Sequence, residues 1–215
     1  MTTCGPRNPG RTRGNLLRAG IRLFASRGFH GVGVAEIVSE AGCNKRMLYH
    51  YFGDKEGLYV AVLQAVYARM EQVETAPLPP EASTAAMICE IMQRHFHFLA
   101  TDNEFVKLLL WENLNEGRLL ARHPGLLTKA PILHQLRTIL EAAQSRGEIT
   151  AADDPRHLLI LMIGMCFIHF SNQHTLRQAV DLDMADPHIQ AEGLRLAQQM
   201  VLAYLGLAPP EANGV

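Results

Sequence analysis

The segment AGCNKRMLYHYFGDK, residues 41–55, concentrates side chains that bind anions. It holds two tyrosines, one histidine and three lysine or arginine residues. A tyrosine hydroxyl donates to phosphate oxygens, and each lysine that neutralises a phosphate releases counterions. Arginine can donate two parallel hydrogen bonds, which suits a guanine edge in the major groove of DNA. These residue types favour a surface that contacts a polyanion.

Two short helices joined by a glycine turn are expected to position this segment. Apolar spacing predicts a helix over about 34–41, Gly42 follows it, and Asn44 is a good N-cap for a second helix ending by Gly53. Leu48 and Phe52 are four residues apart and share the face that anchors the second helix. The residues left mostly outward are Lys45, Met47, Tyr49, His50 and Tyr51. This arrangement is a helix-turn-helix.

Each of these residues also has an ordinary structural interpretation. Tyr49 and Tyr51 taken alone could equally be half-buried packing residues, and a lone Lys45–Arg46 pair is usually a solvated face. As a set, at this spacing and after this turn, they favour contact with DNA.

The remainder of the chain also predicts helices and no strands. A first helix carries Leu17, Ile21 and Phe24 and ends at Gly28, and a fourth runs from Asp54 to Glu74 before the proline-rich residues 75–84. Further helices are expected over about 82–100, 103–119, 126–146, 155–178 and 187–206. The predicted class is all-α, with about nine helices.

Composition and charge limit the possible functions of the chain. Residues 1–60 carry nine Lys/Arg against four Asp/Glu, whereas the rest carries eleven against seventeen, so a basic front precedes an acidic body. The four cysteines form no CxxC pair, which argues against a zinc site or a disulfide framework. The longest apolar run, residues 158–168, is too short to span a bilayer, and the start lacks a signal-peptide core. We expect a cytoplasmic protein with reduced thiols and no metal, cofactor or membrane partner.

Residues 16–63, LLRAGIRLFASRGFHGVGVAEIVSEAGCNKRMLYHYFGDKEGLYVAVL, resemble the N-terminal DNA-binding domain of the TetR/AcrR family of transcriptional repressors. The stretch from Ala41 to Lys55 matches the family's turn and recognition helix without a gap, including its LY core and trailing F-G-x-K. The resemblance implies that Tyr49, Tyr51 and Lys55 grip phosphates. It also implies that the residues facing bases are Lys45, Arg46, Met47 and His50.

One corner departs from the family pattern. Family members usually have two threonines, or Thr-Ser, at the start of the second helix, where this chain has Val32 and Gly33. The hydroxyl N-cap and its phosphate contact are therefore lost, or the backbone amide of Gly33 supplies the contact.

The predicted domains are a DNA-binding domain over residues 1–60, a sensing and dimerisation domain over 61–207, and a tail over 208–215. Within the first domain, residues 1–13 form a basic arm with Arg7, Arg11 and Arg13. Such an arm can enter a minor groove. A disordered tail that only raises non-specific affinity explains the same residues equally well.

The larger part of the chain is expected to bind a ligand and a second subunit. The segment over 157–170 is apolar nearly all round, so more than one neighbour must cover it. The resemblance implies a helical bundle that dimerises through its last two helices and holds a small molecule. Its cavity would be lined by Met92, Phe96, Phe105, Leu109, Trp111, Met162, Cys166, His169 and Phe170. The alternative, that these residues are simply core, stays open.

Three polar pairs in the sequence are candidate sites. His95 and His97 point about 200° apart on a helix and cannot share a metal ion, whereas Cys166 and His169 could share a face. Glu112 and Glu116, on one face of the predicted helix, could bind a cationic ligand. A hydrogen-bonded core histidine, a buried thiol and a solvated acidic surface are the simpler interpretations.

These observations predict a homodimeric TetR-type regulator, a repressor released from a palindromic DNA operator by a small-molecule effector. A dimeric DNA-binding regulator without a physiological ligand is the alternative. An all-α enzyme acting on RNA or another acidic substrate is a distant third, because no acid, base and nucleophile set has recognisable spacing. The sequence alone does not fix the effector, the operator, the regulated genes or repression against activation.

Overall fold

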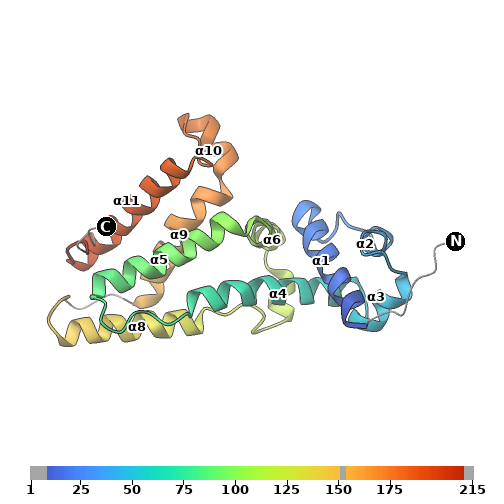
Figure 1. The fold of residues 1–215 in the computed structure, drawn as a ribbon, viewed down its shortest axis with the longest axis horizontal. Coiled ribbons are helices and arrows are strands. Elements are labelled where there is room, and N and C mark those ends of the chain that lie inside the picture. Colours follow the sequence, from blue (N-terminus) through green and yellow to red (C-terminus); the bar gives the residue numbers. More distant parts are fainter. Residues whose placement is uncertain (1–8, 151–153, 211–215) are drawn as a thin grey trace. The chain divides into compact units, whose positions relative to one another are not determined.

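A computed structural model describes residues 9–150 and 154–210. Within these ranges the chain is all-helical, with no strand, as predicted. The eleven helices are α1 Pro9–Arg27, α2 Val34–Glu40, α3 Lys45–Phe52, α4 Lys55–Glu74, α5 Thr84–Thr101, α6 Asn103–Leu114, α7 Arg118–Arg122, α8 Ala130–Ser145, α9 Pro155–Ser171, α10 Gln173–Val180 and α11 Pro187–Leu205 (Figure 1).

The helix count exceeds the predicted nine because two expected helices are each broken once. The predicted helix over 103–119 stops at Leu114, since Glu116 and Gly117 both take positive φ angles, 60° and 62°. The predicted helix over 155–178 stops at Ser171, and Asn172 separates α9 from α10. A left-handed residue cannot continue a right-handed helix, so α7 begins anew after the turn.

The start of α1 corrects the predicted basic arm. α1 begins at Pro9, so Arg11 and Arg13 are helical residues with exposed side chains rather than parts of an irregular arm. The Arg13 guanidinium lies 5.3 Å from the centre of the Phe52 ring. Arg7 and the end of the predicted tail, residues 211–215, lie outside the described residues.

The chain separates into two compact units. The first contains the chain up to Ala68 together with Glu104–Leu127, and the second contains Arg69–Asn103 together with the chain from Thr128 onward. Helices α6 and α7, which the predicted boundary near residue 60 assigns to the sensing part, thus cluster with the DNA-binding segment. α4 is one continuous helix whose first residues belong to the first unit and whose last residues belong to the second.

In the first unit, α1, α2 and α3 pack against one another around a small apolar core. The largest fully buried side chains of this unit are Leu16, Phe24, Ile37, Leu48, Leu58, Tyr59, Leu63 and Leu108. Each comes from a helix whose apolar residues recur every three or four positions, so one face of each helix is buried.

In the second unit, α9 contacts α5, α8, α10 and α11, and α5 also contacts α8 and α11. This central position explains why α9 is apolar nearly all round, as the sequence indicates. The face of α5 that points into the unit carries Ile88, Ile91, Met92, His95, Phe96 and Leu99. His95 is therefore a member of an apolar stripe, spaced like its neighbours at three or four residues.

Candidate functional site

The turn between α2 and α3 fixes the direction of α3. Gly42 adopts a φ of +62°, and the Cys43 amide donates to the Val38 carbonyl at 2.9 Å. The Asn44 side chain accepts from the Met47 amide at 3.2 Å and caps the first turn of α3. The predicted N-cap thus has the expected geometry.

The inner and outer faces of α3 divide only in part as the sequence predicts. Leu48 is completely buried, and Phe52 is half-buried. Tyr51 and Met47 are also half-buried, at the flanks of the helix. The exposed side chains are Lys45, Arg46, Tyr49 and His50, with Tyr49 50% exposed.

The corner at Gly33 is occupied by the chain's own charges. The Gly33 amide donates to the Glu36 carboxylate at 3.4 Å, and Arg27 forms an ion pair with Glu36 at 2.6 Å. The hydrogen bond from Arg27, with that from Gly33, holds the pKa of Glu36 below its ordinary value. The Val32 side chain is buried, so this position contributes packing where the family pattern has a hydroxyl.

Lys55 is less free than its predicted role suggests. Its ammonium donates to the Val32 carbonyl at 2.8 Å and lies 4.3 Å from the centre of the Phe29 ring. Partial burial lowers the pKa of this lysine. Because an ammonium has three hydrogens, the bond to Val32 leaves others for a further acceptor.

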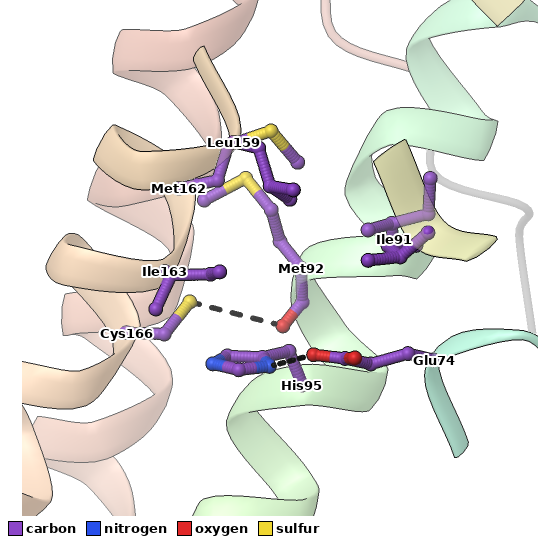
Figure 2. Close-up of a pocket in the computed structure, with 9 residues that line it drawn as sticks. Glu74, Ile91, Met92, His95, Leu159, Met162, Ile163 and Cys166 are labelled. Atoms are coloured by element: carbon purple, nitrogen blue, oxygen red, sulfur yellow. Dashed lines mark hydrogen bonds and ion pairs between the residues drawn. The ribbon is translucent and has the colours of Figure 1, made fainter. Parts of the chain in front are cut away.

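A small cavity lies inside the second unit, between α5 and α9 (Figure 2). Its volume is about 10 Å³, room for about one water molecule. Three of its lining residues, Met92, Met162 and Cys166, belong to the predicted pocket set. Burial raises the pKa of Cys166 to about 12, so this side chain is a neutral thiol at pH 7. The other lining residues are Glu74, Ile91, His95, Ile132, Leu159 and Ile163.

The rest of the predicted pocket set does not line this cavity. Phe96 and Phe170 pack edge to face at 4.8 Å, and the Phe96 ring lies 5.3 Å from His169. The remaining predicted residues, Phe105, Leu109 and Trp111, lie on α6 in the first unit. There the Trp111 indole donates to the Ala25 carbonyl at 3.2 Å, so Trp111 packs against α1.

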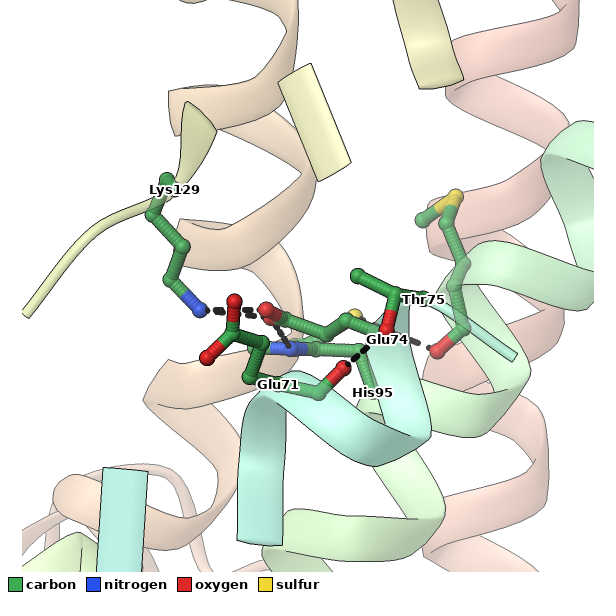
Figure 3. A network of polar contacts seen from close by, with 7 residues as sticks. Glu71, Glu74, Thr75, His95 and Lys129 are labelled. Atoms are coloured by element: carbon green, nitrogen blue, oxygen red, sulfur yellow. Dashed lines mark hydrogen bonds and ion pairs between the residues drawn. The ribbon is translucent and has the colours of Figure 1, made fainter. Parts of the chain in front are cut away.

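A buried polar cluster at the cavity wall was missed by sequence reasoning (Figure 3). His95 Nδ1 lies 3.0 Å from Glu74 Oε1, and the Lys129 ammonium donates to both Glu74 oxygens at 2.6 and 2.7 Å. Burial alone would raise the pKa of Glu74. The hydrogen bond from His95 and the charge and hydrogen bonds of Lys129 outweigh burial, so the pKa lies below its ordinary value.

A signal for part of this cluster was present in the sequence. His95 falls on the same helical stripe as Ile88, Met92 and Leu99, and this spacing predicts a buried side chain. Glu74 and Lys129 carried no such signal, because one ends α4 and the other precedes α8, and only the fold brings them together. Within the described residues, no group of three or more His, Cys, Asp or Glu side chains could hold a metal ion.

The structure corrects the expectation that Glu112 and Glu116 share a face. Glu112 is 3% exposed and accepts a hydrogen bond from the Tyr59 hydroxyl at 2.7 Å. Glu116 lies in the turn after α6 and pairs with Arg118 at the surface. A second cavity, of about 230 Å³, adjoins Tyr59 and Glu112 within the first unit. Among the described helices, none is long and apolar enough to cross a membrane.

Known proteins share both parts of this architecture. Residues 16–62 match the family of bacterial regulatory proteins named tetR, and residues 85–201 match the tetracyclin repressor-like C-terminal domain. The chain is 31% identical over 193 residues to the HTH-type transcriptional repressor NicS of Pseudomonas putida, covering 89% of this chain and 91% of that protein.

Solved structures agree in fold. GusR of Salmonella enterica superposes with a TM-score of 0.69 at 19% identity, covering 93% of this chain and 98% of GusR. The Streptomyces coelicolor regulator SCO4942 gives a TM-score of 0.68 at 21% identity, covering 92% and 99% of the two chains. The chain belongs to the TetR family of bacterial DNA-binding transcriptional regulators.

Proposed function

We propose that this protein is a homodimeric repressor that binds a palindromic operator through α3 and is released from it by a small-molecule effector. The observation that carries the DNA-binding part is the outer face of α3. Lys45, Arg46, Tyr49 and His50 are exposed together, while Leu48 on the opposite face is fully buried. Exposed side chains on this face add little to the stability of the fold, and their chemistry suits contacts in the major groove of DNA.

The proposed contacts divide by chemistry. Tyr49, Tyr51 and Lys55 contact phosphates, and the Gly33 amide can add a further donor at the same corner. The residues proposed to face base edges are Lys45, Arg46, Met47 and His50. Lys55 would keep its bond to Val32 and use a remaining hydrogen, and Gly33 would exchange its long bond to Glu36 for a phosphate.

The proposed dimer contact lies on α9 and α11. On α11, Leu196, Met200 and Tyr204 form an exposed stripe with a spacing of four residues. On α9, Leu161 is 61% exposed and Ile168 is 46% exposed, with exposed Gly164 between them. Two helices from each subunit would bury these stripes in a four-helix contact around a two-fold axis. That axis requires a palindromic operator.

Effector release is proposed as a shift between two dimer states, one of which spaces its α3 helices for DNA. α4 is one helix that begins two residues after Gly53, the C-cap of α3, and ends at Glu74 on the cavity wall. A ligand in that cavity would act directly on the end of this helix. Its effect is limited by the difference between its affinities for the two states.

Binding to DNA that flanks the protein's own gene tests the proposal. We expect selective binding in a fluorescence-anisotropy assay, with affinity falling steeply as salt rises. Arg46→Ala and Tyr49→Ala should each weaken binding at least tenfold while circular dichroism stays unchanged. Gln64→Ala, an exposed position on α4, is the matched control. Equal affinity for random DNA would overturn the operator proposal.

One observation favours a second candidate function. The cavity in the second unit has room for about one water molecule, which is what a dimeric regulator without a physiological ligand would show. Under this candidate the protein binds DNA constitutively and is controlled by its own abundance. A thermal-shift screen of small molecules separates the two, because only a ligand-responsive protein gains stability from binding.

A further inference from the structure

The Glu74–His95–Lys129 cluster is an unusual use of buried charge. Glu74 is 7% exposed and His95 is 6% exposed, and both line a cavity whose other walls are apolar. Glu74 is also the last residue of α4, where the negative end of the helix dipole disfavours a carboxylate. Buried ion pairs are weak contributors to stability compared with apolar residues of similar size. Stability alone therefore does not explain this cluster.

The two nitrogens of His95 have different surroundings. Glu74 is held as an acceptor by Lys129, so His95 Nδ1 must carry the hydrogen that it donates to the carboxylate. His95 Nε2 is buried and has no hydrogen-bond partner among the described residues. In a neutral imidazole with its hydrogen on Nδ1, Nε2 is then an acceptor with an unused lone pair.

Nε2 lies on the cavity side of the ring. Figure 2 shows one edge of the His95 ring toward Glu74 and the other on the side of Cys166 and α9. The Cys166 thiol is directed at the Met92 carbonyl, 3.9 Å away, and burial raises its pKa. Among the described residues, the titratable or charged groups that line the cavity with His95 or bond to this cluster are Glu74 from α4, Lys129 before α8 and the neutral Cys166 thiol from α9. None of them satisfies Nε2.

We propose that His95 Nε2 is the recognition point of the effector site and that the effector is a small, largely apolar molecule with one acidic O–H group, a phenol or a carboxylic acid. This inference rests on the effector release proposed above. Glu74 acts as a positioning residue, since its carboxylate fixes the tautomer of His95 and stabilises the imidazolium. An acid matches this pair better than an alcohol because the proton can move to Nε2.

The proton balance differs between the two kinds of acid. A carboxylic acid is already an anion near neutral pH, so one proton from solvent must be taken up by Nε2 as the carboxylate binds. The complex then holds an imidazolium paired with the ligand anion, and Lys129 balances Glu74. A phenol brings its own proton, which lies between its oxygen and Nε2, so no proton is exchanged with solvent.

The lining explains how so small a cavity can receive such a molecule. Met92 and Met162 are unbranched and can adopt other rotamers, which opens space between α5 and α9. A cavity of roughly 150 Å³ is enough for a benzene ring. The effector must therefore be compact, with a body of about one ring.

Calorimetric titration of the full-length protein with benzoate, phenol and benzyl alcohol tests this inference without DNA. The three probes share one ring, and only benzyl alcohol lacks an acidic O–H. We expect both acids to bind at least tenfold more tightly than benzyl alcohol. At pH 8, benzoate binding should take up close to one proton, measured as the difference between Tris and phosphate buffers. Because this proton comes from solvent, the affinity for benzoate should fall as pH rises.

Two variants on one helix give a matched comparison. His95→Gln should abolish the preference for acids and the proton uptake, whereas His97→Gln, exposed two residues away, should leave both unchanged. Should His95→Gln fail to fold, ¹⁵N chemical shifts of His95 in the unaltered protein replace it. Nε2 should move from the acceptor toward the protonated range when benzoate is added.

Several outcomes would overturn the inference. They are no binding of either acid at millimolar concentration, equal binding of benzyl alcohol, retention of the acid preference in His95→Gln, or an unmoved His95 Nε2 resonance. The proposed function fails separately. If an acid binds through His95 but leaves the protein on its operator, release is wrong and the site stands. If a ligand of other chemistry releases both the unaltered protein and His95→Gln, release stands and the site is wrong.

Discussion

Tyr59 and Tyr67 are both buried on α4, yet their hydroxyls differ in what they meet. The Tyr59 hydroxyl donates to Glu112, which is itself buried, whereas the Tyr67 hydroxyl has no hydrogen-bond partner among the described residues. Burial raises the pKa of both phenols, and the Glu112 charge raises each further. Both tyrosines therefore stay neutral, and only one of them stabilises a carboxylate.

Tyr59→Phe should destabilise the protein by about 1–3 kcal/mol, because it leaves the Glu112 oxygen buried without its donor. Tyr67→Phe should be neutral or slightly stabilising, since it removes an unpaired hydroxyl from the interior. Urea denaturation followed by circular dichroism measures both. Equal effects of the two substitutions would show that ring packing, not the hydrogen bond, carries the role of Tyr59.

The response of the second unit to acid should depend on Lys129. Since the folded pKa of Glu74 is lowered, its contribution to stability is present above the unfolded value near 4.5 and is lost as pH falls through the folded pKa. Lys129→Met removes the compensating charge, burial then dominates, and the pKa of Glu74 rises. Acid unfolding should therefore begin at higher pH. Lys107→Met, at an exposed lysine, is the control and should leave the acid transition in place.

The candidate sites could be predicted from sequence only where the chain is locally continuous. Lys45, Arg46, Tyr49 and His50 lie within six residues, so helical periodicity alone turns them outward. The Glu74–His95–Lys129 cluster joins the last residue of α4, a residue in the middle of α5 and the residue before α8. No local sequence pattern predicts that these three residues lie together. Trp111 was predicted to line the ligand pocket but packs against α1. The sequence does not distinguish these two roles, because a large aromatic residue suits either of them.

At the scale of elements, glycines set where the first helices end. Gly28 and Gly42 both adopt positive φ, +67° and +62°. They differ in their surroundings. A Cβ on Gly28 would lie 2.8 Å from the Trp111 ring, whereas a Cβ on Gly42 meets nothing within 4 Å. The end of α1 therefore needs glycine for conformation and for space, and the end of α2 needs it for conformation alone.

Gly42→Ala should cost about 1–2 kcal/mol from the left-handed backbone. Gly28→Ala should cost about 1–3 kcal/mol more, because the indole that packs on α1 must also shift. Thermal unfolding of the two variants checks the order. If Gly28→Ala were no worse than Gly42→Ala, the contact between α6 and the end of α1 would be looser than the structure indicates.

The helix ends that the sequence did not predict differ in their residues from those that it did predict. Gly28, Gly42 and Gly53 mark ends at glycine, where left-handed backbone is expected. The break after Leu114 starts at Glu116, a residue that rarely takes positive φ, and the break at Asn172 has no glycine or proline. Neither break has a glycine directly after the last helical residue, as α1 and α3 have at Gly28 and Gly53.

At the scale of the whole molecule, the exposed stripes on α9 and α11 are the feature that needs a partner. They expose Leu161, Met200 and Tyr204 by more than half, which is unusual for apolar residues on neighbouring helices. A second copy of the chain would cover both stripes at once. Joining two α3 helices in one particle also makes binding of the second half-site intramolecular.

Leu161→Glu combined with Met200→Glu should convert the proposed dimer to a monomer at micromolar concentration and weaken operator binding by at least tenfold. The charges would be buried unpaired at the contact, while in the monomer they face solvent. Size-exclusion chromatography with light scattering measures the change. Leu114→Glu, at an apolar residue of the first unit that is 73% exposed, should leave the mass unchanged. A monomeric unaltered protein would defeat the dimer proposal outright.

The small volume of the cavity has a kinetic consequence. Space for about one water molecule admits no ring, so side chains between α5 and α9 must move before an effector can occupy the site beside His95. In a stopped-flow experiment, the observed binding rate should then level off as effector concentration rises. The plateau is the rate at which the bundle opens by itself. At high effector concentration, the rate of release from DNA would then be limited by this opening rate and not by the concentration of the effector.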